Sequence, residues 1–155
     1  MGMPQVSVRP ATIDDVEFLS RTVAYSVASM EHSAQEKAEW LAGFREDTRE
    51  QMLGLVEDSL TYVVEADGER VGRLRVVRTA DRVFVAGIQI RSAHQGKGIG
   101  TAVLTGLLKE ARDKGVPAEL HVSKDDPAAE RLYTRLGFRR CGEQGDDYLM
   151  TTTSR

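Results

Sequence analysis

Cysteine is almost absent from this sequence, since Cys141 stands alone among 155 residues. A single cysteine excludes an internal disulfide framework and any zinc site built from two or more thiolates. The three histidines are too few and too scattered to suggest a metal site. A chain of this length buries roughly two thirds of its unfolded surface, so it needs neither a disulfide nor a metal to fold. We predict one domain over residues 1–155 and no bound metal.

Long apolar runs and a strong charge of one sign are absent as well. No apolar run approaches the roughly 20 residues that cross a bilayer, and the first residues lack the apolar core of a secretory signal. The formal net charge is only −3, so no overall basic field favours nucleic acid. Composition therefore predicts a soluble cytoplasmic α/β or α+β protein without a membrane or nucleic-acid partner.

Charge is unevenly distributed along the chain. Residues 31–70 carry eleven acids and four bases, a net charge of −7, whereas residues 71–90 and 91–115 each carry +3. The acidic stretch fits either the solvated face of a helix or a surface that faces a cationic substrate. On the second interpretation, the basic segments bind an anion.

Apolar residues at helical spacing predict four helices, with breaks in the second at Gly43 or Gly54. The third predicted helix, Ile99–Lys114, follows a glycine-rich loop and ends at Gly115. The other three follow residues that favour a helix N-terminus, namely Thr12, Ser33 and Asp126.

Alternating or continuous apolar runs predict seven strands, over residues 6–9, 60–66, 71–78, 83–90, 118–123, 139–142 and 148–152. In residues 71–78, Leu74 and Val76 alternate with Arg73 and Arg75, which predicts one buried and one exposed face. The apolar run 83–90 predicts a central strand buried on both faces. We expect the second, third and fourth strands to form an antiparallel meander. The helix after the fourth strand is expected to connect it to a parallel neighbour, the strand 118–123. The order therefore predicts a mixed sheet with helices on its faces.

A glycine-rich loop connects the fourth strand to the third helix, with the sequence Gln95-Gly96-Lys97-Gly98-Ile99-Gly100-Thr101. Alternate glycines permit positive φ angles and leave no side chain above the backbone. The first N–H groups of the helix lack intrahelical partners and form the positive end of its dipole, so such a loop holds a phosphate or pyrophosphate. Lys97 adds a positive charge. The alternative is a tight connection without a ligand.

Two common phosphate loops do not fit this segment. A Walker A loop requires glycine and Ser or Thr at positions occupied by Arg91 and Gly98. A dinucleotide-binding fingerprint requires glycine or alanine at positions occupied by Thr101 or Val103.

Instead, Gln95-x-x-Gly98-x-Gly100 resembles the Gln/Arg-x-x-Gly-x-Gly/Ala motif of the GNAT superfamily of N-acetyltransferases. The segment from Asp126 to Phe138 resembles the family's Asn-x-x-Ala-x-x-x-Tyr-x-x-x-Gly-Phe sequence, with Asp126 in place of Asn. Similar segments follow one another in family order from residue 6 to about residue 140.

The resemblance implies a single domain with a mixed, mostly antiparallel sheet flanked by about four helices. Acetyl-CoA would lie where two central parallel strands, 83–90 and 118–123, splay apart. Backbone groups of the loop would hold the pyrophosphate, and the end of the first of these strands would pair with the pantetheine arm. The implied contacts to acetyl-CoA are Ile88, Gln89, Ile90, Gln95, Gly96, Lys97, Gly98, Ile99, Gly100, Thr101, Asp126, Ala129 and Tyr133.

Catalytic roles also follow from the resemblance. The Ile90 N–H would polarise the thioester carbonyl, and Tyr133 would act as general acid toward the leaving thiolate. On helical spacing alone, Tyr133 is better explained as a core aromatic residue. Asp126 can still cap a helix, but it lacks the amide donor of the usual Asn.

The implied reaction is direct attack of a primary amine, in a small molecule or peptide, on acetyl-CoA in a ternary complex. A base must accept the amine proton, and residues 83–90 contain no carboxylate. The candidate bases are Glu31, His32, His121 or a chain of water molecules. The acidic stretch leads us to expect a cationic acceptor. The alternatives are a catalytically silent acyl-CoA-binding sensor and an acetyltransferase for protein lysines or N-termini. We expect the protein to be a monomer or a homodimer.

Overall fold

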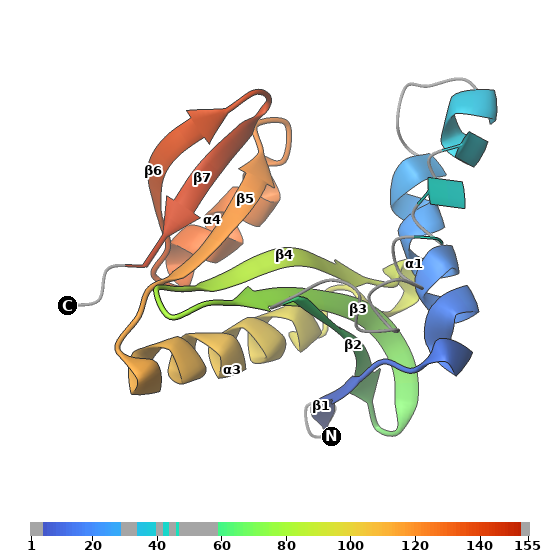
Figure 1. Cartoon of the computed structure of the whole chain (residues 1–155), viewed down its shortest axis with the longest axis horizontal. Helices are drawn as coiled ribbons and strands as arrows, with labels where there is room; N and C mark the ends of the chain where they lie inside the picture. Colours follow the sequence, from blue (N-terminus) through green and yellow to red (C-terminus); the bar gives the residue numbers. More distant parts are fainter. Residues whose placement is uncertain (1–4, 29–33, 40–41, 44–45, 47–58, 153–155) are drawn as a thin grey trace.

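The computed structural model describes residues 5–28, 34–39, 42–43, 46 and 59–152. Its strands are β1 (Val6–Pro10), β2 (Ser59–Ala66), β3 (Glu69–Arg78), β4 (Val83–Ile90), β5 (Ala118–Ser123), β6 (Arg139–Gln144) and β7 (Asp147–Thr151). They form one sheet in the order β1-β2-β3-β4-β5-β7-β6 (Figure 1). Every neighbouring pair is antiparallel except β4 and β5. The predicted mixed, mostly antiparallel sheet is confirmed.

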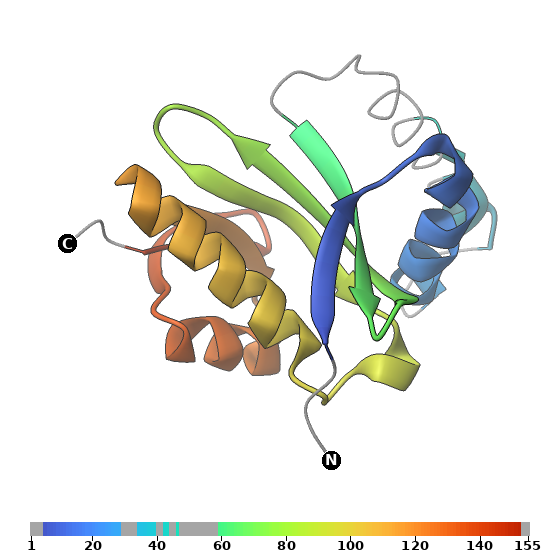
Figure 2. The same ribbon diagram turned by 90° about the horizontal axis from the view of Figure 1, so that it is seen from below.

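The helices cover both faces of this sheet. They are α1 (Val16–Ala28), α3 (Ile99–Lys114) and α4 (Pro127–Arg135), and two short 3₁₀ turns span Ile13–Asp15 and Ser92–His94. Figure 2 shows α3 crossing the underside of the sheet, with α1 beyond its other face. Residues 34–39 are helical as well, whereas Ser33, the expected cap of the second predicted helix, lies outside the described residues.

The main core lies between α3 and the sheet. The helix buries an apolar stripe of Ile99, Val103, Leu104, Leu107 and Ala111, and each large apolar side chain removed from water stabilises the fold by about 1.5–3 kcal/mol. On the opposite face, Phe18 and Leu19 of α1 pack against Val63 of β2. These two contacts fix α1 and α3 on opposite sides of the central strands.

The two parallel strands diverge after a short contact. Their ladder contains only three pairs, Val83 with Ala118, Phe84 with Glu119 and Val85 with Leu120. Beyond them β4 continues beside β3, while β5 turns upward with β7 and β6 (Figure 1). Residues 86–90 therefore present an open edge on the side of β5, which confirms the splay that the family resemblance implies.

Two details of the sequence interpretation are wrong. The predicted exposed face of strand β3 contains Arg73, which is only 7% exposed. Strand β4 is not buried on both faces along its whole length. Its pairing with β5 ends at Val85, and the next residue, Ala86, is exposed.

Candidate active site

The glycine loop reaches α3 through two residues in the left-handed region. Gly96 has φ +77°, and Gly98, which caps α3, has φ +79°. An L-residue there costs roughly 1–2 kcal/mol, so the loop path itself requires glycine at both positions. Gly100 differs, because it lies in the first turn of α3 without a positive φ. A Cβ atom at Gly96 or Gly100 would meet nothing within 4 Å, so the space above this backbone is open.

A cavity of about 500 Å³ opens over the loop, toward α4. Seven of the residues expected to contact acetyl-CoA line it, namely Ile90, Gln95, Gly96, Gly98, Ile99, Gly100 and Thr101. Lys97 lines a neighbouring cavity of about 420 Å³ instead, together with His94 and the β2–β3 hairpin. The structure therefore brings most of the loop residues to one cavity and places Lys97 beside it.

Two arginines of α4 complete the cavity wall and were missed from sequence. Arg131 and Arg135 line the cavity opposite the glycine loop, and neither forms an ion pair with any residue in the described ranges. Their spacing of four residues puts both on one helix face, and this is the signal that sequence reasoning overlooked. Together with the N-terminus of α3 they make the cavity favourable for an anion.

Gln95 connects the loop to the end of β4. Its Nε2 atom donates to the carbonyl oxygen of Ile90 at 2.9 Å. This bond holds the start of the loop against the strand, so Gln95 positions the backbone of the site. The family motif allows Gln or Arg at this position, and both can donate such a bond.

The open edge of β4 presents backbone groups to the gap. Hydrogen bonds alternate along an antiparallel strand between its neighbour and its opposite side. The Arg91 N–H donates to Val71 at 2.8 Å, so Gln89, two residues earlier, also faces β3. Ile88 and Ile90 accordingly direct their N–H groups toward the gap, where the ladder with β5 has ended. This is the orientation that their expected roles require.

Tyr133 lies on α4, half-buried against the main core. Its ring meets Phe138 edge to face at 6.0 Å, and its hydroxyl has no hydrogen-bond partner among the described residues. Burial, with a smaller contribution from the Asp126 carboxylate, raises the pKa of Tyr133 above its ordinary value near 10. The phenol is therefore protonated at neutral pH and can donate to a ligand.

Asp126 acts as the helix cap that the sequence suggests. Its carboxylate accepts from the Ala129 N–H at 3.1 Å at the start of α4. The bond satisfies one of the free donors of the first turn, so the change from the usual Asn leaves the cap intact. At the other end of the helix, Gly137 has φ +108° and Phe138 is buried.

The candidate bases are placed unequally. Glu31 and His32 lie outside the described residues. His121 follows Leu120, the last residue of β5 that pairs with β4, and its exposed ring packs edge to face on Phe84 with 5.1 Å between centroids. His121 is therefore at the point where the two strands separate, whereas Gln89 is farther along the open part of β4. Within the described ranges no cluster of three His, Cys, Asp or Glu side chains could hold a metal ion.

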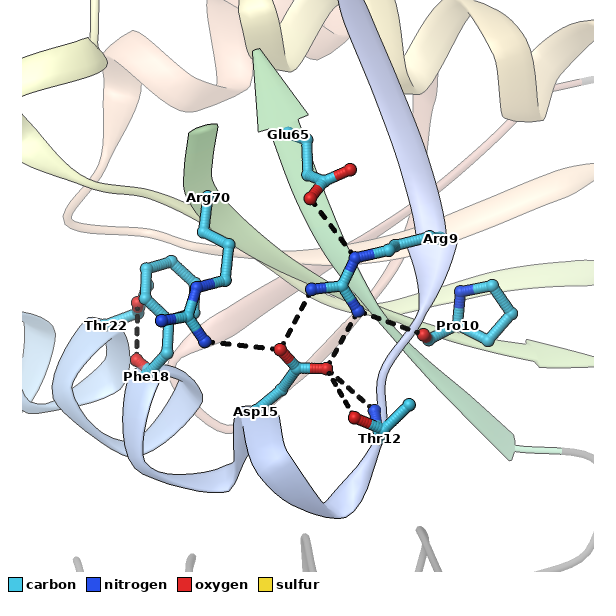
Figure 3. Close-up of polar contacts among 8 residues, drawn as sticks. All are labelled: Arg9, Pro10, Thr12, Asp15, Phe18, Thr22, Glu65 and Arg70. Carbon is cyan, nitrogen blue, oxygen red and sulfur yellow. Dashed lines mark hydrogen bonds and ion pairs between the residues drawn. The ribbon is translucent and has the colours of Figure 1, made fainter. Parts of the chain in front are cut away.

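An ion-pair network around the buried carboxylate of Asp15 anchors the start of α1 to the sheet (Figure 3). The two terminal nitrogens of Arg9 donate to the two oxygens of Asp15 at 2.9 and 3.0 Å, and Arg70 approaches the same carboxylate at 3.3 Å. The Thr12 N–H and hydroxyl also donate to Asp15. These donors, Arg9 above all, hold the pKa of Asp15 well below its usual range. The network ties the start of α1 to β1, β2 and β3.

Comparison with known proteins places these features in context. Residues 24–138 match the model of the acetyltransferase (GNAT) family. Over 89 residues the chain is 35% identical to streptothricin acetyltransferase from Streptomyces lavendulae, covering 55% of this chain and 47% of that protein. It is also 35% identical over 85 residues to L-2,4-diaminobutyric acid acetyltransferase from Nocardia farcinica, covering 52% of this chain and 44% of that one. The chain thus spans about half the length of these relatives.

The fold is shared with solved acetyltransferase structures. The PaiA N-acetyltransferase of Thermoplasma acidophilum in complex with coenzyme A superimposes with a TM-score of 0.76, at 20% sequence identity. The match covers 96% of this chain and 99% of that chain. No described helix is both long and apolar enough to cross a membrane.

Proposed function

Because this chain belongs to the acetyltransferase (GNAT) family, we propose that it transfers an acetyl group from acetyl-CoA to a primary amine of a small molecule or peptide. The observation that carries the proposal is the meeting of three elements at one cavity. The left-handed glycine loop, the end of β4 at Ile90 and helix α4, which also carries Tyr133, line one cavity.

The residues present fit acetyl-CoA. The open space above Gly96 and Gly100, the first N–H groups of α3 and the side chains of Arg131 and Arg135 suit a pyrophosphate. The free N–H groups of Ile88 and Ile90 suit an extended arm that carries amides, in the manner of an added strand. The Ile90 N–H also suits a carbonyl oxygen that gains negative charge.

Bound acetyl-CoA supplies a thioester, which is an activated acetyl donor. A new bond between the amine nitrogen and the carbonyl carbon replaces the bond between that carbon and sulfur. The amine loses a proton and the departing thiolate takes one, so the proton balance is neutral. Tyr133, protonated at neutral pH, is positioned on α4 to donate toward the thiolate.

Removal of the amine proton needs a second group. A lysine-like amine has a pKa of about 10.4, so only about 1 in 2,500 molecules is neutral at pH 7. The proposed acceptors of this proton are His121, which lies where β4 and β5 separate, Glu31, His32 or bound water. Gln89, which lies in the open part of β4, has no basic atom and cannot serve.

A small-molecule acceptor is preferred over a protein. One relative is named for L-2,4-diaminobutyric acid, a small compound with two amines. We place the protein in the cytoplasm as one domain, monomeric or homodimeric, and size-exclusion chromatography with light scattering measures the oligomeric state.

The decisive experiment combines binding and turnover. Isothermal titration calorimetry measures acetyl-CoA binding, and a thiol-release assay measures turnover across a panel of amines and peptides. Binding with amine-dependent thiol release supports an acetyltransferase. Binding without release from any amine or peptide supports a silent sensor and contradicts the proposal. Release with peptides but with no small amine moves the function to protein acetylation.

A further inference from the structure

A third cavity, of about 320 Å³, opens between β1 and α3 on the underside of the sheet (Figure 2). Its wall is mostly apolar, with side chains from the strands and from the helix, namely Val6, Val8, Leu74, Ala102, Val103 and Leu107. It shares no lining residue with the cavity over the glycine loop. Small-molecule sites are concave, largely apolar and about 300–1,000 Å³ in volume. This cavity is therefore large enough for a small ligand other than acetyl-CoA.

One part of the cavity wall is polar, where Tyr62 of β2, Arg78 of β3 and Glu110 of α3 meet. The Nε and Nη2 atoms of Arg78 donate to the two Glu110 oxygens at 2.6 and 3.1 Å, and Nη1 donates to the Tyr62 hydroxyl at 2.6 Å. A guanidinium has five N–H donors, so these three bonds leave two of them over. The Tyr62 hydroxyl accepts in its bond and donates to no described residue. Donors thus remain for a ligand that accepts hydrogen bonds.

This polar part of the wall disfavours a charged ligand of either sign. Arg78 and Glu110 form an ion pair and offset each other. Lys114 also approaches Glu110 at 3.3 Å, but it is exposed and does not line the cavity, so solvent screens its charge. An anion would meet the Glu110 carboxylate and a cation would meet Arg78, and an unpaired charge is costly to remove from water.

An amide group matches the same three side chains without carrying a charge. Its carbonyl oxygen can accept from the Tyr62 hydroxyl and from the unused N–H groups of Arg78. Its N–H group can donate to Glu110, because a carboxylate has about four acceptor sites and only three bonds to Glu110 are made, by Arg78 and Lys114. A neutral amide on an apolar chain is therefore the ligand that fits both parts of the wall.

Gly106 keeps this cavity open in the middle of α3. A glycine inside a helix is destabilising relative to alanine. Neither backbone geometry nor packing requires it here, since Gly106 has no positive φ and a Cβ atom at this position would meet nothing within 4 Å. Because Gly106 lines the cavity, a larger side chain at this position would enter the space that a ligand would fill.

We propose that this cavity is a binding site for a small aliphatic amide. The apolar chain of the ligand lies on the valines and leucines of the wall, and its amide group binds Tyr62, Arg78 and Glu110. Binding at this site is measured without acetyl-CoA, so the proposal stands or falls independently of the proposed acetyltransferase function.

The test compares three ligands with the same six-carbon chain, namely hexanamide, hexanoate and hexylammonium. Each is titrated into the full chain while NMR follows the backbone amide signals. Hexanamide should shift the signals of Val8, Val103 and Gly106 saturably, with a Kd in the millimolar range or below. The two ions should bind at least fivefold more weakly, because each loses hydration without gaining an unpaired opposite charge.

Three variants locate the site. Gly106→Leu fills the cavity, so it should abolish the shifts while the thermal midpoint of unfolding stays equal or rises. Thr105→Leu adds the same side chain on an exposed part of α3 outside the cavity and should bind hexanamide as the parent does. Tyr62→Phe retains the ring but lacks the hydroxyl donor, and it should weaken hexanamide binding about fivefold.

Four outcomes would overturn the proposal. The parent could show no saturable shift with hexanamide, or it could bind one of the two ions more tightly than hexanamide. Equal binding of hexanamide by the parent and by Gly106→Leu would place the ligand elsewhere. If light scattering shows that Gly106→Leu converts a dimer into a monomer, the cavity belongs to an interface between two copies of the chain and is not a ligand site.

Discussion

Tyr133 is the residue at which packing and catalysis are most easily confused. Its ring packs on Phe138 and the main core, which would suffice to explain an aromatic residue on α4. Its hydroxyl, however, contributes nothing to that packing and has no partner among the described residues. A substitution that removes only the oxygen therefore separates the two roles.

We expect Tyr133→Phe to lower kcat at least tenfold, since general acid catalysis contributes about 10²–10⁴-fold. The Kd for acetyl-CoA should change less than threefold, because the ring is retained. Stopped-time thiol release and calorimetry measure the two quantities. Tyr148→Phe on β7 is the matched control and should retain kcat. A variant with the turnover of the parent would show that Tyr133 is a packing residue.

Asp15 is the second residue whose substitution should have a measurable effect, in this case on the stability of the fold. We expect Asp15→Asn to lower the free energy of unfolding at pH 7 by about 2 kcal/mol, because charge-assisted hydrogen bonds from Arg9 are lost. Denaturation by urea measures this change. The exposed neighbour Asp14→Asn is the control and should have little effect.

The pH dependence of that difference follows from the direction of the pKa shift. Folding lowers the pKa of Asp15 from its ordinary value of 3.8, so its stabilisation is complete above that value and disappears as the pH falls through the folded-state pKa. The difference between the parent and Asp15→Asn should therefore be constant above about pH 5 and shrink below about pH 4. A constant difference down to pH 2 would rule out the ion pair as its source.

At the level of elements, the glycine loop and α3 form the part of the site that sequence predicts best. Gln95, Gly98 and Gly100 are local in sequence, and their spacing dictates both the turn and the helix start. The sequence alone does not show that glycine stands at each of these positions for a different structural reason. Gly98 is required by its φ angle, whereas Gly100 leaves space above an ordinary helical turn.

We therefore expect chemically identical substitutions to behave differently. Gly98→Ala should weaken acetyl-CoA binding roughly tenfold, because a left-handed alanine costs roughly 1–2 kcal/mol. Gly100→Ala should change the Kd less than threefold, since Gly100 has no positive φ and the family motif allows Gly or Ala at this position. Calorimetry measures both, and circular dichroism checks the fold. Equal affinities for the two variants would contradict the role assigned to the left-handed cap.

Helix α4 provides a second prediction at this level. Arg131→Gln and Arg135→Gln should each weaken acetyl-CoA binding roughly fivefold, because an ionic hydrogen bond to a phosphate is lost. Their Kd values should also depend less on salt than the Kd of the parent. Arg139→Gln, on β6 outside the cavity, is the matched control. A parent Kd that is insensitive to salt would exclude these contacts.

Across the whole molecule, the elements and their order follow from sequence, because apolar periodicity and turn residues are local signals. The positions of β2 to β5, α3 and α4 agree with the expected spans within a few residues. Long-range charge pairing was not predictable. Within their own segments, Arg73 and Asp15 look like surface residues. The burial of Arg73 is seen only from the register of β3 on β4, and that of Asp15 only from its ion pair with Arg9 of β1.

The splay itself can be tested in solution by hydrogen exchange. Addition of acetyl-CoA should slow exchange at the amides of Ile88 and Ile90 at least tenfold, since these groups face the gap and gain a partner. The amide of Gln89 faces β3 and should change little, so it is an internal control on the same strand. Unchanged exchange at Ile88 and Ile90 in the saturated protein would show that the ligand does not pair with β4.

The short ladder between β4 and β5 also affects how this protein avoids association with other chains. An exposed strand edge is a template for aggregation, and most sheets have two, at their outer strands. Here a third edge lies inside the sheet, at residues 86–90, flanked by β5 on one side of the gap (Figure 1). Its position between β4 and β5 restricts the approach of a strand from another folded chain more than the approach of a slender ligand with amide groups. The interior edge thus combines the recognition of a free strand with protection from polymerisation.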